Sequence, residues 1–169
     1  MSFFRRILPV LVVAALAGCG FEPVHAPGGS ASGLRGQLRA DAPADRNDFD
    51  FVARIENRLG RGVGASYGLS YEIETDEEPV GVTPGQEITR YNIVGVAKYD
   101  VVELDTGQVV HSGRVESFAS YSSTGSIVST LTAGTDARSR LMIALADRVE
   151  AELVAAAPAW LAGAGSESR

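Results

Sequence analysis

The residue best suited to covalent chemistry is Cys19, which carries the only thiol in the 169-residue chain. It stands in the stretch AALAGCGFEP, where an apolar run gives way to polar residues. Arg5 and Arg6 form a basic head, and positions 7–18 hold no charged residue. A basic head followed by an apolar run of roughly 7–15 residues is typical of a secretory signal peptide, whereas a membrane-spanning helix needs about 20 apolar residues. The sequence therefore predicts a signal peptide over residues 1–18.

The end of this segment, Leu16-Ala17-Gly18-Cys19, resembles the lipobox of bacterial lipoproteins. The resemblance implies that the Cys19 thiol receives a diacylglyceryl group, that the signal is cut before Cys19, and that the new amino terminus is acylated. One acyl chain binds a membrane only marginally, and stable anchoring takes two or more. Gly20 stands where an Asp retains enterobacterial lipoproteins in the inner membrane, which favours the outer membrane. We expect Cys19 to be a lipidation site and neither part of a disulfide nor a catalytic thiol.

The charge balance limits the partners of the mature chain. The full chain has 15 basic and 21 acidic side chains, and cleavage removes two arginines and no acid, which leaves 13 − 21 = −8. An acidic protein binds nucleic acid poorly without specific contacts, so no nucleic-acid partner is expected. With its one thiol lipidated, the chain can form no internal disulfide. Its remaining length suffices for one domain with its own core.

Composition divides the mature chain into three parts. Residues 22–33 are rich in Pro, Gly, Ser and Ala, which predicts that residues 19–33 form a lipidated amino terminus and a flexible tether. Residues 34–157 carry the periodic patterns of an α/β domain. Residues 158–169 are expected to form a disordered tail, because Pro158 interrupts the pattern and small, polar residues end the chain.

The first half of the domain predicts a strand, a helix and a second strand. The first strand spans residues 34–40. The helix that follows begins at Asn47 or Asp48 as N-cap and ends at Gly60, and its apolar face comprises Phe51, Val52, Ile55 and Leu59. Residues 66–75 then alternate strictly, which indicates a strand buried on one side. The inward residues of this strand are Tyr67, Leu69, Tyr71 and Ile73.

The second half predicts a hairpin and a long helix. Residues 76–86 are expected to form a loop because they contain Pro79 and Pro84. Two extended runs follow, 87–104 and 108–121, joined by a turn at Asp105–Gln108. Their imperfect alternation predicts a β-bulge.

A polar loop is expected over residues 123–135, and the last helix is expected to run from Asp136 to Pro158. Its apolar stripe comprises Leu141, Leu145, Val149 and Leu153. The order β-α-β-β-β-α predicts an α+β fold in which two helices pack on one face of a mostly antiparallel sheet of about four strands, and the other face stays open.

No arrangement of residues in the chain indicates an enzyme, a cofactor or a metal site. His25 falls in the tether, and His111 falls in the middle of a strand between Val110 and Ser112, where a histidine is usually an ordinary strand residue and not a catalytic base. The stretch GRGVGA at 60–65 matches a dinucleotide-binding pattern, but a helix precedes it and a strand follows, which is the reverse of the required order. The acids at 76–78 could bind a divalent cation or could form an ordinary solvated loop.

The stretch from Arg90 to Leu153 resembles the LPS-assembly lipoprotein LptE family. The resembling features are a strand that ends in tyrosine, a hairpin turn, a returning strand that leads to Ser-Tyr, and a helix of the form Asp-Ala-x-x-Arg-x-x-x-x-Leu-Ala-Asp. The opening CGFEPV also looks like the start of that family. These features are found here at Cys19–Val24, Tyr99, Asp105–Gly107, Ser120-Tyr121, Asp136-Ala137, Arg140 and Leu145-Ala146-Asp147.

The resemblance implies a fold, a location and a set of partners. LptE proteins fold as a sheet with two helices on one side and insert into the lumen of the outer-membrane β-barrel LptD. There they act as a plug, bind lipopolysaccharide and help to move it to the outer leaflet. The chain is thus expected to be lipid-anchored at the outer membrane and to face the periplasm. The alternative is an auxiliary lipoprotein of a periplasmic or inner-membrane transport complex.

The resemblance does not locate the lipopolysaccharide contacts, and an acidic chain must use a local basic patch for an anionic glycolipid. The candidates are Arg90, Lys98 and Arg114, which fall on the strands of the hairpin. Arginine holds phosphate through two parallel hydrogen bonds. The competing interpretation is that these cations form ordinary surface pairs with Glu103, Glu116 or Asp100.

Overall fold

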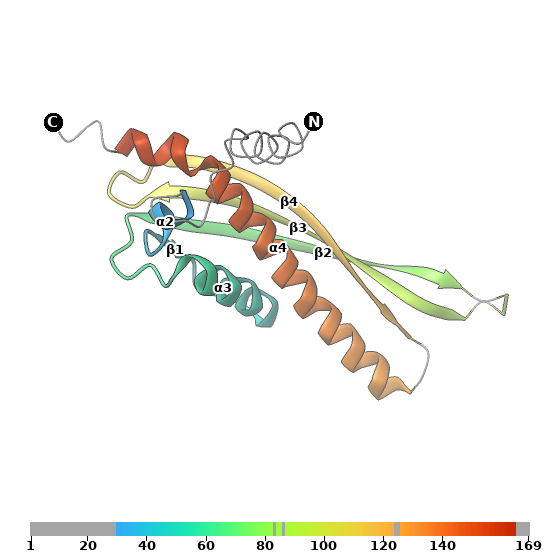
Figure 1. Ribbon diagram of the computed structural model, residues 1–169. Helices are drawn as coiled ribbons and strands as arrows, with labels where there is room; N and C mark the ends of the chain where they lie inside the picture. The colour runs from blue at the N-terminus through green and yellow to red at the C-terminus, as the bar shows by residue number, and fades with distance from the viewer. Residues whose placement is uncertain (1–29, 83, 86, 124–125, 165–169) are drawn as a thin grey trace, which may run out of the picture.

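A computed structural model describes residues 30–82, 84, 85, 87–123 and 126–164 (Figure 1). Cys19, the predicted signal peptide, His25 and most of the predicted tether lie outside the described residues. The described elements follow the predicted α+β order, with one additional helical turn at the start. They are α2 (Ser30–Leu34), β1 (Leu38–Ala40), α3 (Arg46–Leu59), β2 (Tyr67–Val82), β3 (Ile88–Glu103), β4 (Val109–Ser122) and α4 (Ile127–Ala164).

The four strands form one sheet in the order β1-β2-β3-β4. The short β1 pairs in parallel with the start of β2, and the other pairs are antiparallel. The long β2–β3 hairpin extends beyond the helices at one end, and α4 crosses the sheet diagonally with α3 beside it (Figure 1). Both long helices cover the same face, so the predicted layer arrangement is confirmed.

Alternation along the strands and helical spacing along α4 together build the core. Tyr67 and Leu69 on β2 are buried against the helices, as predicted. The predicted stripe of α4 is confirmed, since Leu141, Leu145, Val149 and Leu153 are fully buried. A Cβ atom built on Gly95 of β3 would lie 3.0 Å from side-chain atoms of Leu141 and Leu145. The absence of a side chain at Gly95 therefore lets α4 approach the sheet closely over β3.

Helix α3 has the predicted apolar face and the predicted end at Gly60, whose φ of 86° suits glycine. Its N-cap is Asp45 rather than Asn47 or Asp48. The Asp45 side chain accepts a hydrogen bond from the backbone N–H of Asp48 at 2.9 Å, which satisfies one free donor of the first turn. Asp45, Asn47 and Asp48 all carry side-chain oxygens that can cap a helix, and the sequence alone did not show which of them is the N-cap.

The predicted loop at residues 76–86 is largely strand, because β2 continues to Val82. Pro79 is tolerated there because β1 pairs only with residues 67–69 of β2, so the outer edge of β2 is free at Pro79. Register shifts occur on either side of Gly81. The bulge predicted in the hairpin is confirmed between Val101 and Val102, and Gly107 in the turn has a φ of 72°.

The predicted loop at 123–135 is also wrong, because α4 begins at Ile127. The Ser126 hydroxyl accepts from the Ser129 N–H at 3.2 Å and so acts as an N-cap. The hydroxyls of Thr132 and Thr135 donate to backbone carbonyls four residues earlier. These polar side chains are thereby satisfied within a helix, which their composition alone did not indicate.

Helix α4 does not stop at Pro158 but continues to Ala164, so residues 158–164 are not a disordered tail. Packing holds this last part in place, because Trp160 is buried edge-on against Tyr67 with ring centroids 4.8 Å apart. At the other terminus, residues 30–33 form a helical turn instead of tether, and the expected strand at 34–40 is shortened to β1. Leu34 is fully buried and anchors this turn.

None of the helices in the described ranges is both long enough and apolar enough to cross a membrane.

Candidate functional surface

Even-numbered residues of the long strands point away from the helices and form the open face of the sheet. Arg90, Lys98 and Arg114 all belong to this face and all are exposed. Lys98 stands between Glu72 and Arg114 in one row across β2, β3 and β4. Arg90 lies about 26 Å from Lys98 along β3, at roughly 3.3 Å per residue. The three candidates therefore share a face but divide into two separate places.

Lys98 is held by acids of the neighbouring strand β2. Its Nζ lies 2.7 Å from Glu74 and 3.8 Å from Glu72. The hydrogen bond and the charge of Glu74 raise the pKa of Lys98, and the same contacts lower the pKa of Glu74. These side chains are solvent-exposed, so the pairing adds little stability. The pairing does, however, neutralise the positive charge of Lys98 that an incoming anion would need.

Arg114 lies 3.8 Å from Glu116 on its own strand. The competing interpretation of ordinary surface pairing is therefore correct for Arg114 and Glu116. It is wrong for Asp100, which accepts a hydrogen bond from the Ser112 hydroxyl. A shallow depression of about 540 Å³ lies around this row and includes Lys98, Arg114, Glu72 and Asp100. Its two cations and two acids balance, so it suits a neutral polar group better than a phosphate.

Arg90 lies in a different hollow, of about 420 Å³, between the end of β4 and the first half of α4. Its other polar residues are Ser120, Tyr121, Ser122, Asp136 and Arg140. Arg140 donates to Asp136 at 2.9 Å and to the Ser120 backbone carbonyl at 3.4 Å. Within the described ranges, no ion pair involves Arg90. The hollow thus combines one unpaired guanidinium, one paired guanidinium and several hydroxyls.

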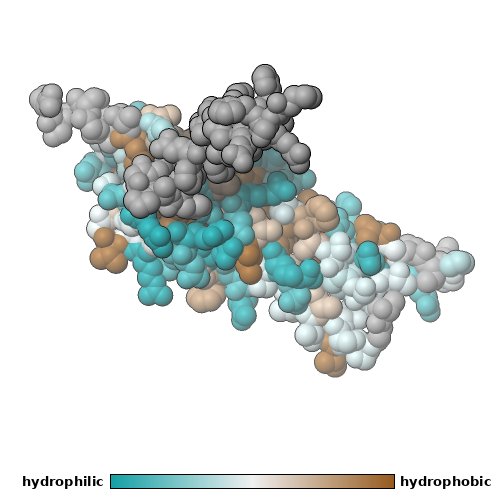
Figure 2. Space-filling view, viewed as in Figure 1, coloured by the Kyte–Doolittle hydropathy of each residue, from teal (hydrophilic) through white to brown (hydrophobic). Residues whose placement is uncertain are grey.

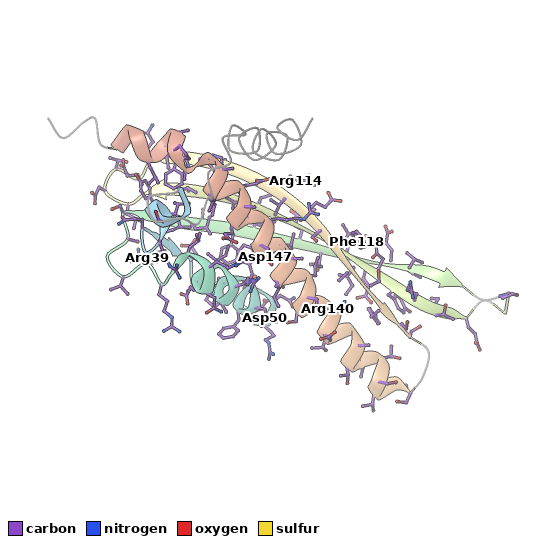
Figure 3. All side chains as sticks on the ribbon, viewed as in Figure 1. Arg39, Asp50, Arg114, Phe118, Arg140 and Asp147 are labelled. Atoms are coloured by element: carbon purple, nitrogen blue, oxygen red, sulfur yellow. The ribbon has the colours of Figure 1, made fainter. Side chains whose placement is uncertain are left out.

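Sequence reasoning did not identify Arg140 as part of this site. The residue was noticed as a member of the helix pattern that resembles LptE, but its strand partner could not be found by spacing. Almost the whole β3–β4 hairpin, a loop and the first turns of α4 separate Arg90 from Arg140 in the chain, and only the packing of α4 against β4 brings them to one hollow. Figure 3 labels Arg140 on α4, and Arg114 and Phe118 on the outer side of β4.

A half-buried polar cluster lies on the helix side near this hollow. Glu77 of β2 accepts hydrogen bonds from Arg138 of α4 and from the Tyr121 hydroxyl. Burial, and then the Glu77 carboxylate, raise the pKa of Tyr121 to about 12. The Tyr121 ring also stacks on Tyr91 at 5.3 Å between centroids. The cluster joins two strands to α4 and is a structural link between them.

The acids at 76–78 do not converge on one point. Because they lie on a strand, Glu77 points to the helices while Asp76 and Glu78 point to the open face. In the described part of the chain, no three His, Cys, Asp or Glu side chains come together as metal ligands would. His111 lies on β4 beside the Tyr99 ring, with centroids 5.9 Å apart.

Comparisons with known proteins bear on the fold. The chain matches no protein-family model and no curated protein. A Caulobacter crescentus CB15 protein described as a lipoprotein has a similar structure, with a TM-score of 0.61 and 22% identity, over 79% of this chain and 96% of that one. The rare lipoprotein B of Shewanella oneidensis matches with a TM-score of 0.55 and 12% identity, over 70% and 92%. A minor lipoprotein of Acinetobacter baumannii matches with a TM-score of 0.54 and 10% identity, over 70% and 88%. At these identities the likeness shows that this chain has the fold of those lipoproteins.

Proposed function

We propose that the chain is an outer-membrane lipoprotein, anchored through Cys19, that partners a β-barrel of the LptD type in assembling lipopolysaccharide. The observation that carries this proposal is a coincidence of two kinds of likeness. The sequence features that resemble LptE lie in order along β3, β4 and α4. The fold is that of rare lipoprotein B, a name used for the same family.

The proposed role is that of a binding subunit and plug, without catalysis. A sheet with both helices on one side leaves a long polar face that a barrel wall could contact. The alternative function, an accessory lipoprotein of an inner-membrane transport complex, would use the same anchor and the same fold. The two differ in the partner and in the membrane.

Purification of the tagged full-length lipoprotein from solubilised membranes tests the partner. We expect a large β-barrel of the LptD type to copurify from the outer-membrane fraction. Recovery of inner-membrane transporter subunits would favour the alternative and contradict the proposal.

A second experiment tests the lipid anchor, with Cys19→Ala as the matched control. This substitution should prevent acylation, which mass spectrometry of the purified protein measures directly, and an unmodified Cys19 in the membrane-bound parent would refute the lipid anchor.

Within this function, we propose that the hollow at Arg90 and Arg140 contacts the phosphates of lipopolysaccharide. Arg90 has no acidic partner within the described ranges, whereas Lys98 is paired with Glu74 at 2.7 Å and Arg114 with Glu116 at 3.8 Å. Two guanidiniums and neighbouring hydroxyls can together supply the parallel hydrogen bonds that a phosphate accepts. The unpaired arginine makes this place more favourable for an anion than the balanced depression at Lys98.

Two charge reversals on the same strand compare these places. Arg90→Glu in the full-length protein should weaken binding to purified lipopolysaccharide about tenfold, since a charge-assisted contact contributes roughly 1.5–3 kcal/mol. Lys98→Glu is the matched control and should leave binding within about twofold. Equal binding by parent and Arg90→Glu, with the fold retained by circular dichroism, would remove Arg90 from the site. A large loss in Lys98→Glu alone would move the site to the other depression.

A further inference from the structure

The sheet has two free edges, and they differ in how they are protected. Beyond Leu69, the outer edge of β2 has no neighbouring strand among the described residues. This strand carries a row of acids and Pro79, which discourage the addition of another strand. The acids on its open face are Glu72, Glu74, Asp76 and Glu78. A second β2 placed beside this edge would bring like charges together.

The other edge is β4, whose outward backbone groups can be assigned from its hydrogen bonds. The Ser123 N–H donates to the Thr89 carbonyl at 3.0 Å, so odd-numbered residues bond inward to β3. Even-numbered residues alternate with them and turn their N–H and C=O groups outward. Arg140 accordingly reaches the Ser120 carbonyl from outside the sheet. From 112 to 118, no hydrogen bond in the described part of the chain uses these outward groups.

We propose that β4 pairs antiparallel with β4 of a second copy of this chain, with Val115 at the twofold axis. This register places Arg114 opposite Glu116 of the second copy, and Glu116 opposite its Arg114. Both residues have outward backbone groups, so the two strands would exchange hydrogen bonds at these positions. A shift of the register to either neighbouring setting sets Arg114 against Arg114 or Glu116 against Glu116. The charge pattern therefore selects one register.

The helices leave room for this pairing. At the level of the axis α4 lies over β3 and β4, because it packs on both strands and Leu141 and Leu145 contact Gly95, which pairs with Ser117 of β4. Two copies joined at β4 would hold their α4 helices about two to three strand spacings apart, roughly 10–14 Å. Packed helices need about 8–10 Å between axes. The helices would thus not collide, and the sheet could continue through both copies.

The pairing also covers an exposed aromatic side chain. Phe118 on the open face of β4 is 69% exposed and lies on the outer side of that strand (Figure 3). In the same register Phe118 stands opposite Ser112 of the second copy, on a hydrogen-bonded pair with side chains on one face. A small residue opposite the ring leaves it space to lie across the new strand. The inference concerns self-association and does not depend on the proposed function.

Sedimentation of the full-length protein in detergent over a range of concentrations tests the pairing. The parent should form dimers as its concentration rises. Arg114→Glu and Glu116→Arg should each weaken dimerisation about tenfold, because each brings two like-charged pairs together. The double reversal R114E/E116R should restore the affinity of the parent. Asp76→Lys lies on the same face two strands inward, away from Arg114 and Glu116, and should not change it.

A mixture of the two single variants gives the sharpest outcome. One variant carries two acids and the other two basic residues at positions 114 and 116, so mixed dimers should form at concentrations at which neither variant dimerises alone. Melting of each variant, followed by circular dichroism, verifies that the fold is retained. A parent that stays monomeric at every concentration would overturn the proposal. Single variants that dimerise as the parent does, or a mixture without mixed dimers, would overturn it as well.

Discussion

The two ends of the molecule are stabilised in different ways. At the end where both described termini lie, α2, β1 and the last turns of α4 bury large apolar side chains, among them Leu34, Leu38 and Trp160. At the opposite end, the first turns of α4 and the tip of the β2–β3 hairpin expose theirs. The exposed residues there are Val80, Ile88, Ile127, Val128 and Leu131. Figure 2 shows isolated hydrophobic residues among near-neutral surface at the end where α4 begins.

We call the first of these the terminal end and the second the hairpin end. Polar contacts replace hydrophobic burial at the hairpin end. Glu77 joins β2 to Arg138 and Tyr121, and the stacked rings of Tyr91 and Tyr121 join β3 to β4. Such contacts are directional but contribute less free energy than full burial of a large side chain. We therefore expect the terminal end to unfold only with the whole domain, and the hairpin end to open locally first.

The largest effect should come from Trp160→Ala at the terminal end. The Trp160 ring is buried against Tyr67, and removal of such a ring leaves a cavity that costs about 3–5 kcal/mol. Denaturant unfolding of the full chain should show this loss as a lower midpoint. An unchanged midpoint would mean that α4 beyond Pro158 contributes no stability, which would return residues 158–164 to the predicted tail.

A pair of identical substitutions compares the two ends directly. Leu34→Ala removes a fully buried side chain and should lower the free energy of unfolding by about 2–4 kcal/mol. Leu131→Ala removes a side chain that is 67% exposed and should change it by less than about 0.5 kcal/mol. Unfolding in urea measures both. Similar losses in the two variants would show that the exposed end is covered in the folded protein.

The sequence predicted most of the packed parts of this fold because burial imposes a periodicity. The stripe from Leu141 to Leu153, the inward residues of β2 and the face of α3 all repeat at the spacing of their element. All are buried as expected except Tyr71 and Ile73 of β2, which are partly buried. The first turns of α4 were missed for the same physical reason. Ile127, Val128 and Leu131 face solvent, so no buried face is available there to give a pattern.

Two prolines show where local rules are overridden by neighbours. Pro79 was expected to lie in a loop at residues 76–86 and Pro158 to end α4, since proline lacks the backbone donor of a regular element. The free edge of β2 does not need that donor, and the burial of Trp160 outweighs the loss in α4. The candidate site was predictable only in part for a related reason. The face of Arg90 followed from alternation, but its neighbour Arg140 depends on how α4 lies on β4.

Glu77→Ala should have an intermediate effect, confined to the hairpin end. The substitution leaves the half-buried Arg138 and Tyr121 without their shared acceptor. We expect a loss of about 2 kcal/mol, because an unsatisfied buried partner costs roughly 1–3 kcal/mol. Hydrogen exchange should become faster in residues 76–80 and 88–92 and stay unchanged in β1. Faster exchange at both ends would contradict the division into two differently stabilised regions.

Tyr121→Phe removes only one of the two bonds to Glu77 and should cost about 1 kcal/mol at neutral pH. Its clearer signature is in alkali. Burial and Glu77 raise the pKa of Tyr121 from its ordinary value near 10 to about 12. A raised pKa means that the folded state favours the protonated phenol. This contribution to stability is complete below about pH 10 and is lost as the pH rises from about 10 to 12.

The melting temperature of Tyr121→Phe should therefore fall less steeply than that of the parent between about pH 10 and 12. Tyr71→Phe is the matched control from the better packed part of the sheet. Burial also raises the pKa of Tyr71 to about 12, but its buried hydroxyl has no hydrogen-bond partner among the described residues. Tyr71→Phe should likewise flatten the alkaline decline, yet without the loss at neutral pH. If Tyr121→Phe and the parent decline in parallel, the phenol of Tyr121 is not buried, and the hairpin end is already open in the folded protein.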